Sequence, residues 1–291
     1  SNGNQASLEI NQTWDADPEV AKWLQNTEFR QALSVGIDRE LMNEAVFLGT
    51  GRLKNPVYNP KHAMYPGEEI EKRFVRYDVA EANATLDKIG LDKKDSAGRR
   101  LRSDGKPLVV EVTYIENYFL DYESIAEITK TAWEAIGIGV SLNAEDVNLF
   151  AGKRPENEHQ IVVGSAGMWA PPFPMGTSGF APLISDWVSS DGSKGQAPTG
   201  DLKRLIDIGL QVPDLRYGDR KALYTEAADI IATQQYYIGL VGDTPAFNGV
   251  IVIKNYFKNV PDVAPNVPHL QNPGIARTEQ FFLEGGKNDS E

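Results

Sequence analysis

The residues that could carry out covalent chemistry lack the spacing that such chemistry needs. Ser165 lies in the segment VGSAG, where Val163 occupies a position that the nucleophile motif G-x-S-x-G gives to glycine. A second segment, GTSG at 176–179, is one residue short of the same motif. The tight turn that exposes a nucleophilic serine requires both glycines. The serines therefore do not predict a hydrolase.

The histidines and cysteines give no metal or thiol site. The chain has three histidines and no cysteine, which excludes a thiol nucleophile, a disulfide and a cysteine-based zinc site. His62, His159 and His269 are far apart in the sequence, and a metal site or a triad would need several of them to converge. We therefore expect surface or hydrogen-bonded histidines.

Three short segments fall short of known ligand-binding motifs. GSKG at 192–195 lacks the G-K-[ST] ending of a phosphate loop, and GIGVSL at 137–142 lacks the third glycine of the dinucleotide fingerprint. DKKDSAG at 92–98 lacks the alternating oxygen ligands of a calcium loop. Acidic residues are numerous, but spacing distinguishes no pair of them. A hydrolase that uses an unrecognised carboxylate pair stays open as an alternative.

The strongest local signal is a segment at 165–200 that is rich in glycine, proline and serine but also carries large aromatic residues. Trp169 and Trp187 are among them. Long loops of this composition are uncommon in compact domains and are usually functional. Tryptophan offers a large rigid surface with one polar group, which suits recognition of sugars, peptides or small amphiphiles. The alternative, that the tryptophans pack this loop onto its own domain, also stays open.

The overall composition excludes two classes of partner. The chain has 291 residues and a formal net charge of −12, so it lacks the basic surplus that nucleic-acid binding requires. It contains no run of about 20 apolar residues that could span a bilayer. Residues 1–14 have neither the basic start nor the apolar stretch of a signal peptide, and SNG is typical of an expression remnant.

The first half of the chain predicts two consecutive helices, a third helix and a hairpin. Thr27 is a candidate N-cap for a helix over 27–36, and Asp38 for the helix that follows it, which we expect to end at the glycines that come next. Asp78 begins a helix with a capping-box spacing. An Asp–Gly turn at 104–105 leads into a strand over 108–114.

The second half alternates strands and helices, which predicts an α/β fold with parallel strands covered by helices. The expected helices lie at about 121–136, 200–212 and 217–234, with a short one after Asp146. The expected strands lie at 138–143, 160–166, 236–242 and 250–255.

Four segments together resemble family 5 of the extracellular solute-binding proteins, the peptide, nickel and oligosaccharide receptors of ABC importers. FRQALSVGIDRELMNEAVFLGTG at 29–51 is similar to the family's F-R-x-A-L-x-x-A-I-D-R-E, and YDVAEANATLDKIGL at 77–91 to its Y-D-P-x-x-A-x-x-L-L-x-x-A-G-L. AGRRLRSDGKPLVVEV at 97–112 and AWEAIGIGVSL at 132–142 match its D-G-K-P-L and I-G-I-x-V-x-L elements. Each match alone is weak, but their order along the chain is that of the family.

The resemblance implies the fold class, which is an α/β lobe of the periplasmic-binding-protein type II kind, with a mixed sheet flanked by helices. It covers only the C-terminal half of a full receptor. Residues 1–26 are then an inter-lobe lead-in, 27–253 the second lobe, and 254–291 a return segment toward the missing first lobe.

The same resemblance implies a function. The protein is expected to be the substrate-binding component of an ABC importer, with no enzymatic activity and no cofactor. It would capture a peptide- or oligosaccharide-like solute between two lobes and deliver it to the membrane permease. The full-length protein would lie outside the cytoplasm, in the periplasm or as a cell-surface lipoprotein. A sensor or interaction module on the same fold is a further alternative.

The resemblance also nominates residues that contact the solute. The loop after the strand at 160–166 contributes Ser165, Met168, Trp169 and Phe173. The turn after the strand at 108–114 contributes Glu116, Asn117 and Tyr118, and the aromatic segment adds Trp187. Peptide receptors of the family carry an aspartate in this loop, whereas this chain has no carboxylate there before Asp186. That difference favours an oligosaccharide or a longer or modified peptide over a free short peptide, and the lack of a His or Cys cluster argues against nickel and haem.

Overall fold

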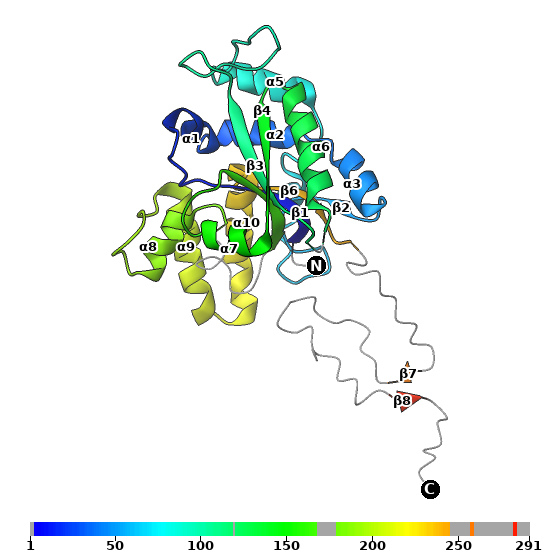
Figure 1. Cartoon of the computed structure of the whole chain (residues 1–291). Helices are drawn as coiled ribbons and strands as arrows, with labels where there is room; N and C mark the ends of the chain where they lie inside the picture. The colour runs from blue at the N-terminus through cyan, green and yellow to red at the C-terminus, as the bar shows by residue number, and fades with distance from the viewer. Residues whose placement is uncertain (1–2, 119, 168–178, 245–256, 259–281, 284–291) are drawn as a thin grey trace. The chain divides into compact units, whose positions relative to one another are not determined.

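The computed structural model describes residues 3–118, 120–167, 179–244, 257–258 and 282–283. The chain divides into two units, a compact body over Asn2–Thr244 and a second unit that contains Pro245–Glu291 (Figure 1). In the second unit, the short strands β7 (Phe257–Lys258) and β8 (Phe282–Leu283) pair antiparallel. The strand predicted at 250–255 lies outside the described residues.

The body is built around one six-stranded sheet with the order β2-β6-β1-β5-β3-β4. β3 pairs in parallel with both β4 and β5, whereas β1 pairs antiparallel with β5 and β6 and β2 pairs antiparallel with β6. The sheet is therefore mixed, as the family resemblance implies, whereas the alternation of strands and helices alone predicts parallel strands. The strands are β1 (Gly3–Ile10), β2 (Arg52–Leu53), β3 (Val109–Ile115), β4 (Gly139–Glu145), β5 (Ile161–Gly167) and β6 (Tyr237–Gly242).

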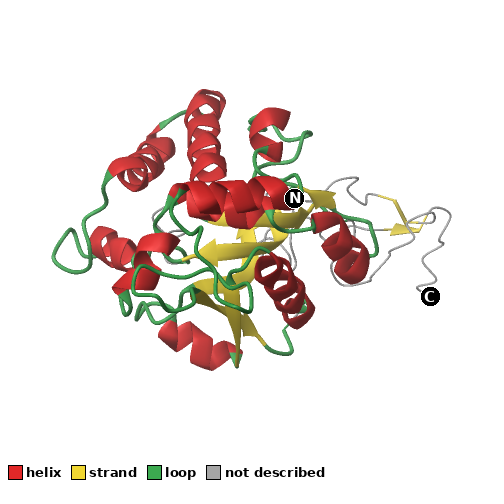
Figure 2. Cartoon of the chain, turned by 90° about the horizontal axis from the view of Figure 1, so that it is seen from above, coloured by secondary structure: helices red, strands yellow, loops and turns green. Residues whose placement is uncertain are grey.

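Helices lie on both sides of the sheet (Figure 2). Side chains from α1 (Pro18–Leu24), α2 (Thr27–Val35), α3 (Arg39–Phe47), α5 (Val79–Lys88) and α6 (Tyr122–Ala135) pack with the sheet in one hydrophobic cluster. A second cluster joins α4 (Glu68–Lys72), α8 (Pro182–Ser189), α9 (Gly200–Gln211) and α10 (Lys221–Gln234). α7 (Val147–Lys153) follows β4 directly.

The predicted helix starts are confirmed where a carboxylate caps the helix. Asp38 accepts a hydrogen bond from the Leu41 amide at 3.0 Å and so separates α3 from α2, and Asp78 begins α5 by the same contact with the Glu81 amide at 2.8 Å. The prediction for α2 was wrong by one residue, because the capping side chain belongs to Asn26. Leu48, in the left-handed conformation, ends α3 ahead of the glycines.

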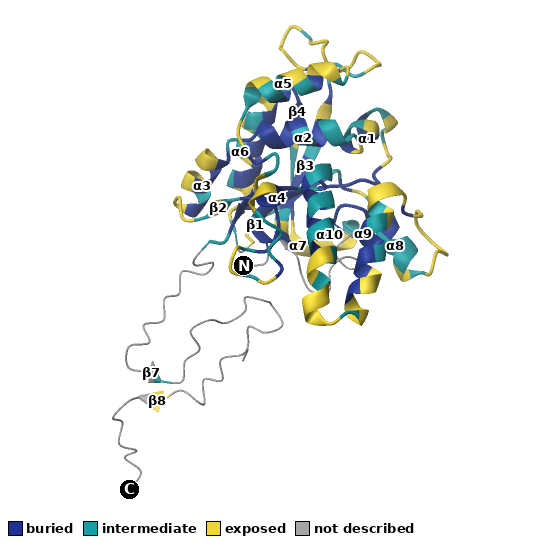
Figure 3. Cartoon of the chain, turned by 180° about the vertical axis from the view of Figure 1, so that it is seen from behind, coloured by how far each residue is buried: buried dark blue, intermediate teal, exposed yellow. Residues whose placement is uncertain are grey.

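Two segments differ from the expectation. The first residues were expected to be a lead-in, but β1 lies in the middle of the sheet, where Leu8 and Ile10 are fully buried. The aromatic segment was expected to be a loop, but residues 182–189 of it form α8, which begins with a proline at its first position. Figure 3 shows that buried residues follow β1 and the strands beside it.

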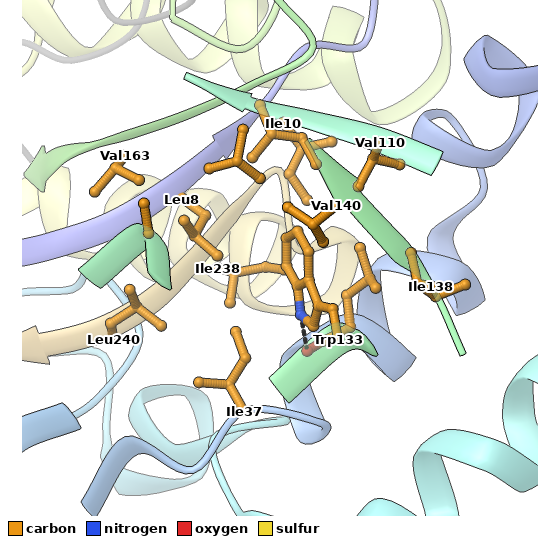
Figure 4. Close-up of a cluster of buried hydrophobic side chains, with 14 of the residues drawn as sticks. Leu8, Ile10, Ile37, Val110, Trp133, Ile138, Val140, Val163, Ile238 and Leu240 are labelled. Atoms are coloured by element: carbon orange, nitrogen blue, oxygen red, sulfur yellow. Dashed lines mark hydrogen bonds between the residues drawn. The ribbon is translucent and has the colours of Figure 1, made fainter. Parts of the chain in front are cut away.

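Trp133 of α6 is the largest fully buried side chain in the body. It lies among aliphatic side chains of the sheet, such as Ile238 and Val140, and its indole Nε1 donates a hydrogen bond to the Leu33 carbonyl at 3.1 Å (Figure 4). The C-terminal half of α6 is thereby tied both to the sheet and to α2.

We expect Trp133→Phe to lower the free energy of unfolding by about 2 kcal/mol, because it removes a buried hydrogen bond and leaves a gap in the core. Urea unfolding followed by circular dichroism measures this change. Trp23→Phe is the matched control, since the Trp23 indole nitrogen has no hydrogen-bond partner among the described residues. Equal losses in the two variants would contradict the prediction.

Candidate functional site

A cavity of about 340 Å³ opens where β3 ends and α6 begins. The carboxyl ends of strands are the usual ligand-binding edge of α/β sheets. The residues that line the cavity come from the turn between the two elements and from the first turn of the helix: Ile115, Glu116, Asn117, Tyr118, Leu120, Asp121, Tyr122 and Glu123. No lysine or arginine is among them.

The backbone around the cavity is held on both sides. The Glu116 amide donates to the Glu145 carbonyl at 3.0 Å, which ties the turn to the end of β4. Asp121 caps α6 by accepting from the Ser124 amide at 3.0 Å and from its hydroxyl at 2.6 Å. Between these anchors, Asn117 adopts a left-handed φ of 50°, a conformation that asparagine tolerates better than most residues. The two ends of the turn are therefore held in place, at Glu116 and at Asp121.

Two tyrosines form the aromatic part of the cavity. The rings of Tyr118 and Tyr122 stack with centroids 6.1 Å apart. Tyr118 is 44% exposed, whereas Tyr122 is buried. Burial raises the pKa of the Tyr122 hydroxyl, which is hydrogen-bonded to the side chain of Ser165 on β5. The contact brings β5 to the same cavity.

The structure gathers part of the predicted site. Glu116, Asn117 and Tyr118 line one cavity, and Ser165 is joined to it through Tyr122. Met168, Trp169 and Phe173 lie outside the described residues. The roles of all these residues in binding stay predictions.

Trp187 is placed differently. It lies half-buried on α8, and its backbone carbonyl accepts a hydrogen bond from the Gly192 amide at 2.8 Å. A Cβ added at Gly192 would be 3.3 Å from the Trp187 indole, so this ring packs on the turn that follows its own helix. Trp187 is not among the residues that line the cavity. The contact matches the alternative in which an aromatic residue of this segment packs onto its own domain.

Tyr122 is a cavity residue that the sequence analysis missed. Its position directly after Asp121, the N-cap of α6, was the available signal, because the first turn of a helix that follows a strand points back to the strand's end. The sequence analysis also did not single out Glu9 as a buried ion-pair residue, since nothing in its sequence surroundings distinguishes it from other acidic residues.

Glu9 lies on the central strand β1 and is buried, and its ion-pair partner Arg154, which directly follows α7, is partly exposed. Burial raises the pKa of the Glu9 carboxyl, and the Arg154 guanidinium opposes this shift. Gly179 lies directly over the pair, where an added Cβ would collide with both side chains. Glycine is therefore required at the point where the described chain resumes after residue 178.

His159 fixes the same point from the other side. Its Nε2 lies 3.0 Å from the Gly179 carbonyl and donates to it, while its own carbonyl accepts from the Asn11 side chain at 2.8 Å. Burial lowers the pKa of the His159 imidazole. This is a hydrogen-bonded histidine, as the sequence predicts, in a buried position.

The described residues hold no group of three or more His, Cys, Asp or Glu side chains that could bind a metal ion. Among the same residues, no helix has the length and apolar character needed to cross a bilayer.

The comparisons with known proteins identify the family. Residues 1–183 match the family described as bacterial extracellular solute-binding proteins, family 5, middle region. The chain therefore belongs to family 5 of the bacterial extracellular solute-binding proteins. A search of curated proteins found no match.

Solved structures of solute-binding proteins share the fold. An oligopeptide-binding protein, OppA, is 26% identical with a TM-score of 0.74, and the match covers 90% of this chain and 44% of that one. The MelB protein of Agrobacterium fabrum, solved with stachyose, is 18% identical with a TM-score of 0.63 and coverage of 82% and 38%. A Thermotoga maritima oligopeptide-binding protein, solved with mannohexaose, is 16% identical with a TM-score of 0.62 and coverage of 90% and 47%. This chain spans less than half the length of each.

The buried histidine makes stability depend on pH. Because the pKa of His159 is lower in the folded than in the unfolded state, its neutral form stabilises the fold above the ordinary value of 6.5, and this contribution is lost as the pH falls through 6.5 toward the lowered pKa. We expect His159→Gln to lose less stability than the wild type between about pH 7.5 and about pH 5.5 in urea unfolding.

His62→Gln is the control for this measurement. The pKa of His62 is lowered in the same direction, but its ring is only half-buried and stacks on Tyr58 at 4.0 Å. His62→Gln should therefore change the pH dependence of the stability less than His159→Gln does. The prediction is wrong if His159→Gln follows the wild-type profile.

Proposed function

We propose that this chain is one lobe of a solute receptor of an ABC importer, and that the cavity at the end of β3 is part of its solute-binding face. The observation that carries the proposal is the cavity itself, which gathers Glu116, Asn117 and Tyr118 in a chain that belongs to a family of solute-binding proteins. The solute would be a peptide or an oligosaccharide, held between this lobe and a second one that the chain does not contain.

The chemistry of the cavity supports an oligosaccharide or a polar peptide. The exposed ring of Tyr118 offers a flat surface on which a sugar face or a side chain can stack, and Glu116 and Asn117 supply carboxylate and amide groups for hydroxyl or amide hydrogen bonds. Structures similar to this one were solved with stachyose and with mannohexaose, and another is an oligopeptide-binding protein. Both solute classes therefore belong in the test.

The remaining parts of the proposal follow from the family. The receptor would deliver its solute to the membrane permease of the importer. It would work outside the cytoplasm, in the periplasm or as a lipoprotein at the cell surface. The proposal includes no catalytic role. Of the three carboxylates around the cavity, Asp121 caps α6, Glu123 is hydrogen-bonded to Tyr114, and Glu116 is assigned to solute binding.

A thermal-shift panel of oligopeptides and oligosaccharides on the two-lobed receptor tests the function. At least one compound should raise the melting temperature, because a ligand that binds only the folded state stabilises it. Tyr118→Ala and Trp169→Ala should remove most of that shift. Tyr217→Ala is the matched control, since Tyr217 is 59% exposed but lies on a 3₁₀ turn away from the cavity residues.

A panel without any shift would refute the proposed function. A shift that survives Tyr118→Ala would leave the receptor function standing and remove this cavity from the solute-binding face.

The isolated chain should bind the same solute much more weakly than the two-lobed receptor. If two faces contribute equally to a micromolar affinity of about −8 kcal/mol, one face retains about −4 kcal/mol, which corresponds to a millimolar dissociation constant. Isothermal titration of the 291-residue chain measures this. A micromolar dissociation constant for the chain alone would contradict the two-lobe interpretation.

A further inference from the structure

The chain enters and leaves the body at neighbouring points. Asn4, at the beginning of β1, pairs with Gly242, at the end of β6. The body then ends at Thr244, whose amide is 3.4 Å from the Gln5 side chain. Any movement of this body relative to further parts of a receptor therefore passes through two strands that lie side by side.

Lys54, which follows β2, contacts both of these strands. Its carbonyl accepts a hydrogen bond from the Asn4 side chain at 2.7 Å, on the entering strand. Its ammonium donates to Asp243 Oδ2 at 3.1 Å, at the end of the leaving strand. Lys54 therefore links the two strands: its backbone carbonyl contacts the entering strand, and its side-chain ammonium contacts the end of the leaving strand.

The approach of Lys54 to β6 requires glycines. A Cβ added at Gly242 would lie 3.1 Å from Lys54 Cδ and 2.6 Å from the Gly3 carbonyl. A Cβ at Gly239 would overlap the Lys54 carbonyl. The strand therefore presents bare backbone along the length of the lysine, which allows a contact closer than any other residue type would permit.

The ammonium lies in a buried group of balanced charges. The Lys54 side chain is 0% exposed and that of Glu71 only 1%, with their charged atoms 3.9 Å apart. Arg52 donates to both oxygens of Glu71 at 2.9 Å, and Tyr65 donates to one of them at 2.9 Å. Asp243, in the left-handed conformation with φ of 55°, completes the group with a second carboxylate.

Buried charges of this kind contribute little net stability, because desolvation offsets most of their attraction. They do impose geometry, since removing one partner leaves the other charge buried and unpaired. The direction in which the chain leaves the body at Asp243 is therefore set by Lys54.

We propose that Lys54 is a positioning residue for solute capture, which holds the entering and leaving strands together so that the lobe turns as one rigid body when the receptor closes. This inference rests on the proposed function of capture between two lobes. Loss of the lysine charge then loosens the contact between these two strands without removing any residue of the cavity.

The test uses Lys54→Met in the two-lobed receptor and measures two quantities. One is the affinity for the solute found by the panel, and the other is the distance between the lobes, from a pair of spin labels in the solute-free receptor. This chain has no native cysteine, so Ser193→Cys, in an exposed turn, gives a single labelling site on this lobe. We expect a broader distance distribution and a roughly tenfold weaker affinity, within the range of typical coupling between sites.

Asp243→Asn is the second variant, because it keeps the side-chain shape and stays informative if Lys54→Met does not fold. Arg100→Met is the matched control. Arg100 is also a fully buried cation with a carboxylate partner, Asp87, but its contacts lie in α5, just after α5 and at the end of α6, and not on β1 or β6. It should lower the melting temperature and leave the distance distribution narrow.

Distributions as narrow as in the wild type for both Lys54→Met and Asp243→Asn would overturn the inference, as would equal broadening in Arg100→Met. A receptor that binds no compound of the panel would refute the proposed function. The distance distributions of the solute-free variants would still decide the role of Lys54.

Discussion

The central strand of the sheet is buried on both faces, and it carries a carboxylate on one of them. Leu8 and Ile10 of β1 enter the main core, while Glu9, between them, turns to the opposite side. An ionised carboxylate in such a place is unfavourable by several kcal/mol unless it is paired. The chain meets this need with Arg154, directly after α7, and with a glycine at 179 where the backbone passes over the pair. The position of α7, and with it the edge of the sheet beside the cavity, follows from that one buried charge.

The same solution recurs at the other end of the central strands. Lys54 and Glu71 are buried as Glu9 is, and glycines again give the space that the charged side chains need. Both groups lie against backbone that passes closely over them or leaves the body, rather than where the core needs volume: one lies against Gly179, and the other lies at Asp243. Aliphatic packing around Trp133 supplies the bulk of the cohesion, and the buried ionic contacts supply direction.

Features that depend on neighbours in the sequence could be predicted, and features that depend on distant partners could not. Asp38 and Asp78 cap their helices through amides three residues away, so the pattern of residue types contained the information. The place of β1 in the sheet could not be derived in this way, because its strand partners are more than 150 residues further along the chain. Ser7, for example, donates to the Gly164 carbonyl at 3.2 Å. α8 was missed since glycines and prolines surround it on both sides.

The residues of the cavity also divide into those that could be predicted from the sequence and those that could not. The cavity shows in addition what a single lobe can offer. Glu116, Asn117 and Tyr118 follow from the rule that strand ends form the site, whereas Tyr122 belongs to the first turn of α6 and contacts Ser165 on a strand more than 40 residues away. Sites for small ligands usually enclose most of the ligand's surface. A ring as exposed as that of Tyr118, at 44%, cannot do this on its own, so a solute stacked on it would keep one face in water. A second surface opposite this tyrosine is what would turn a stacking platform into an enclosed site.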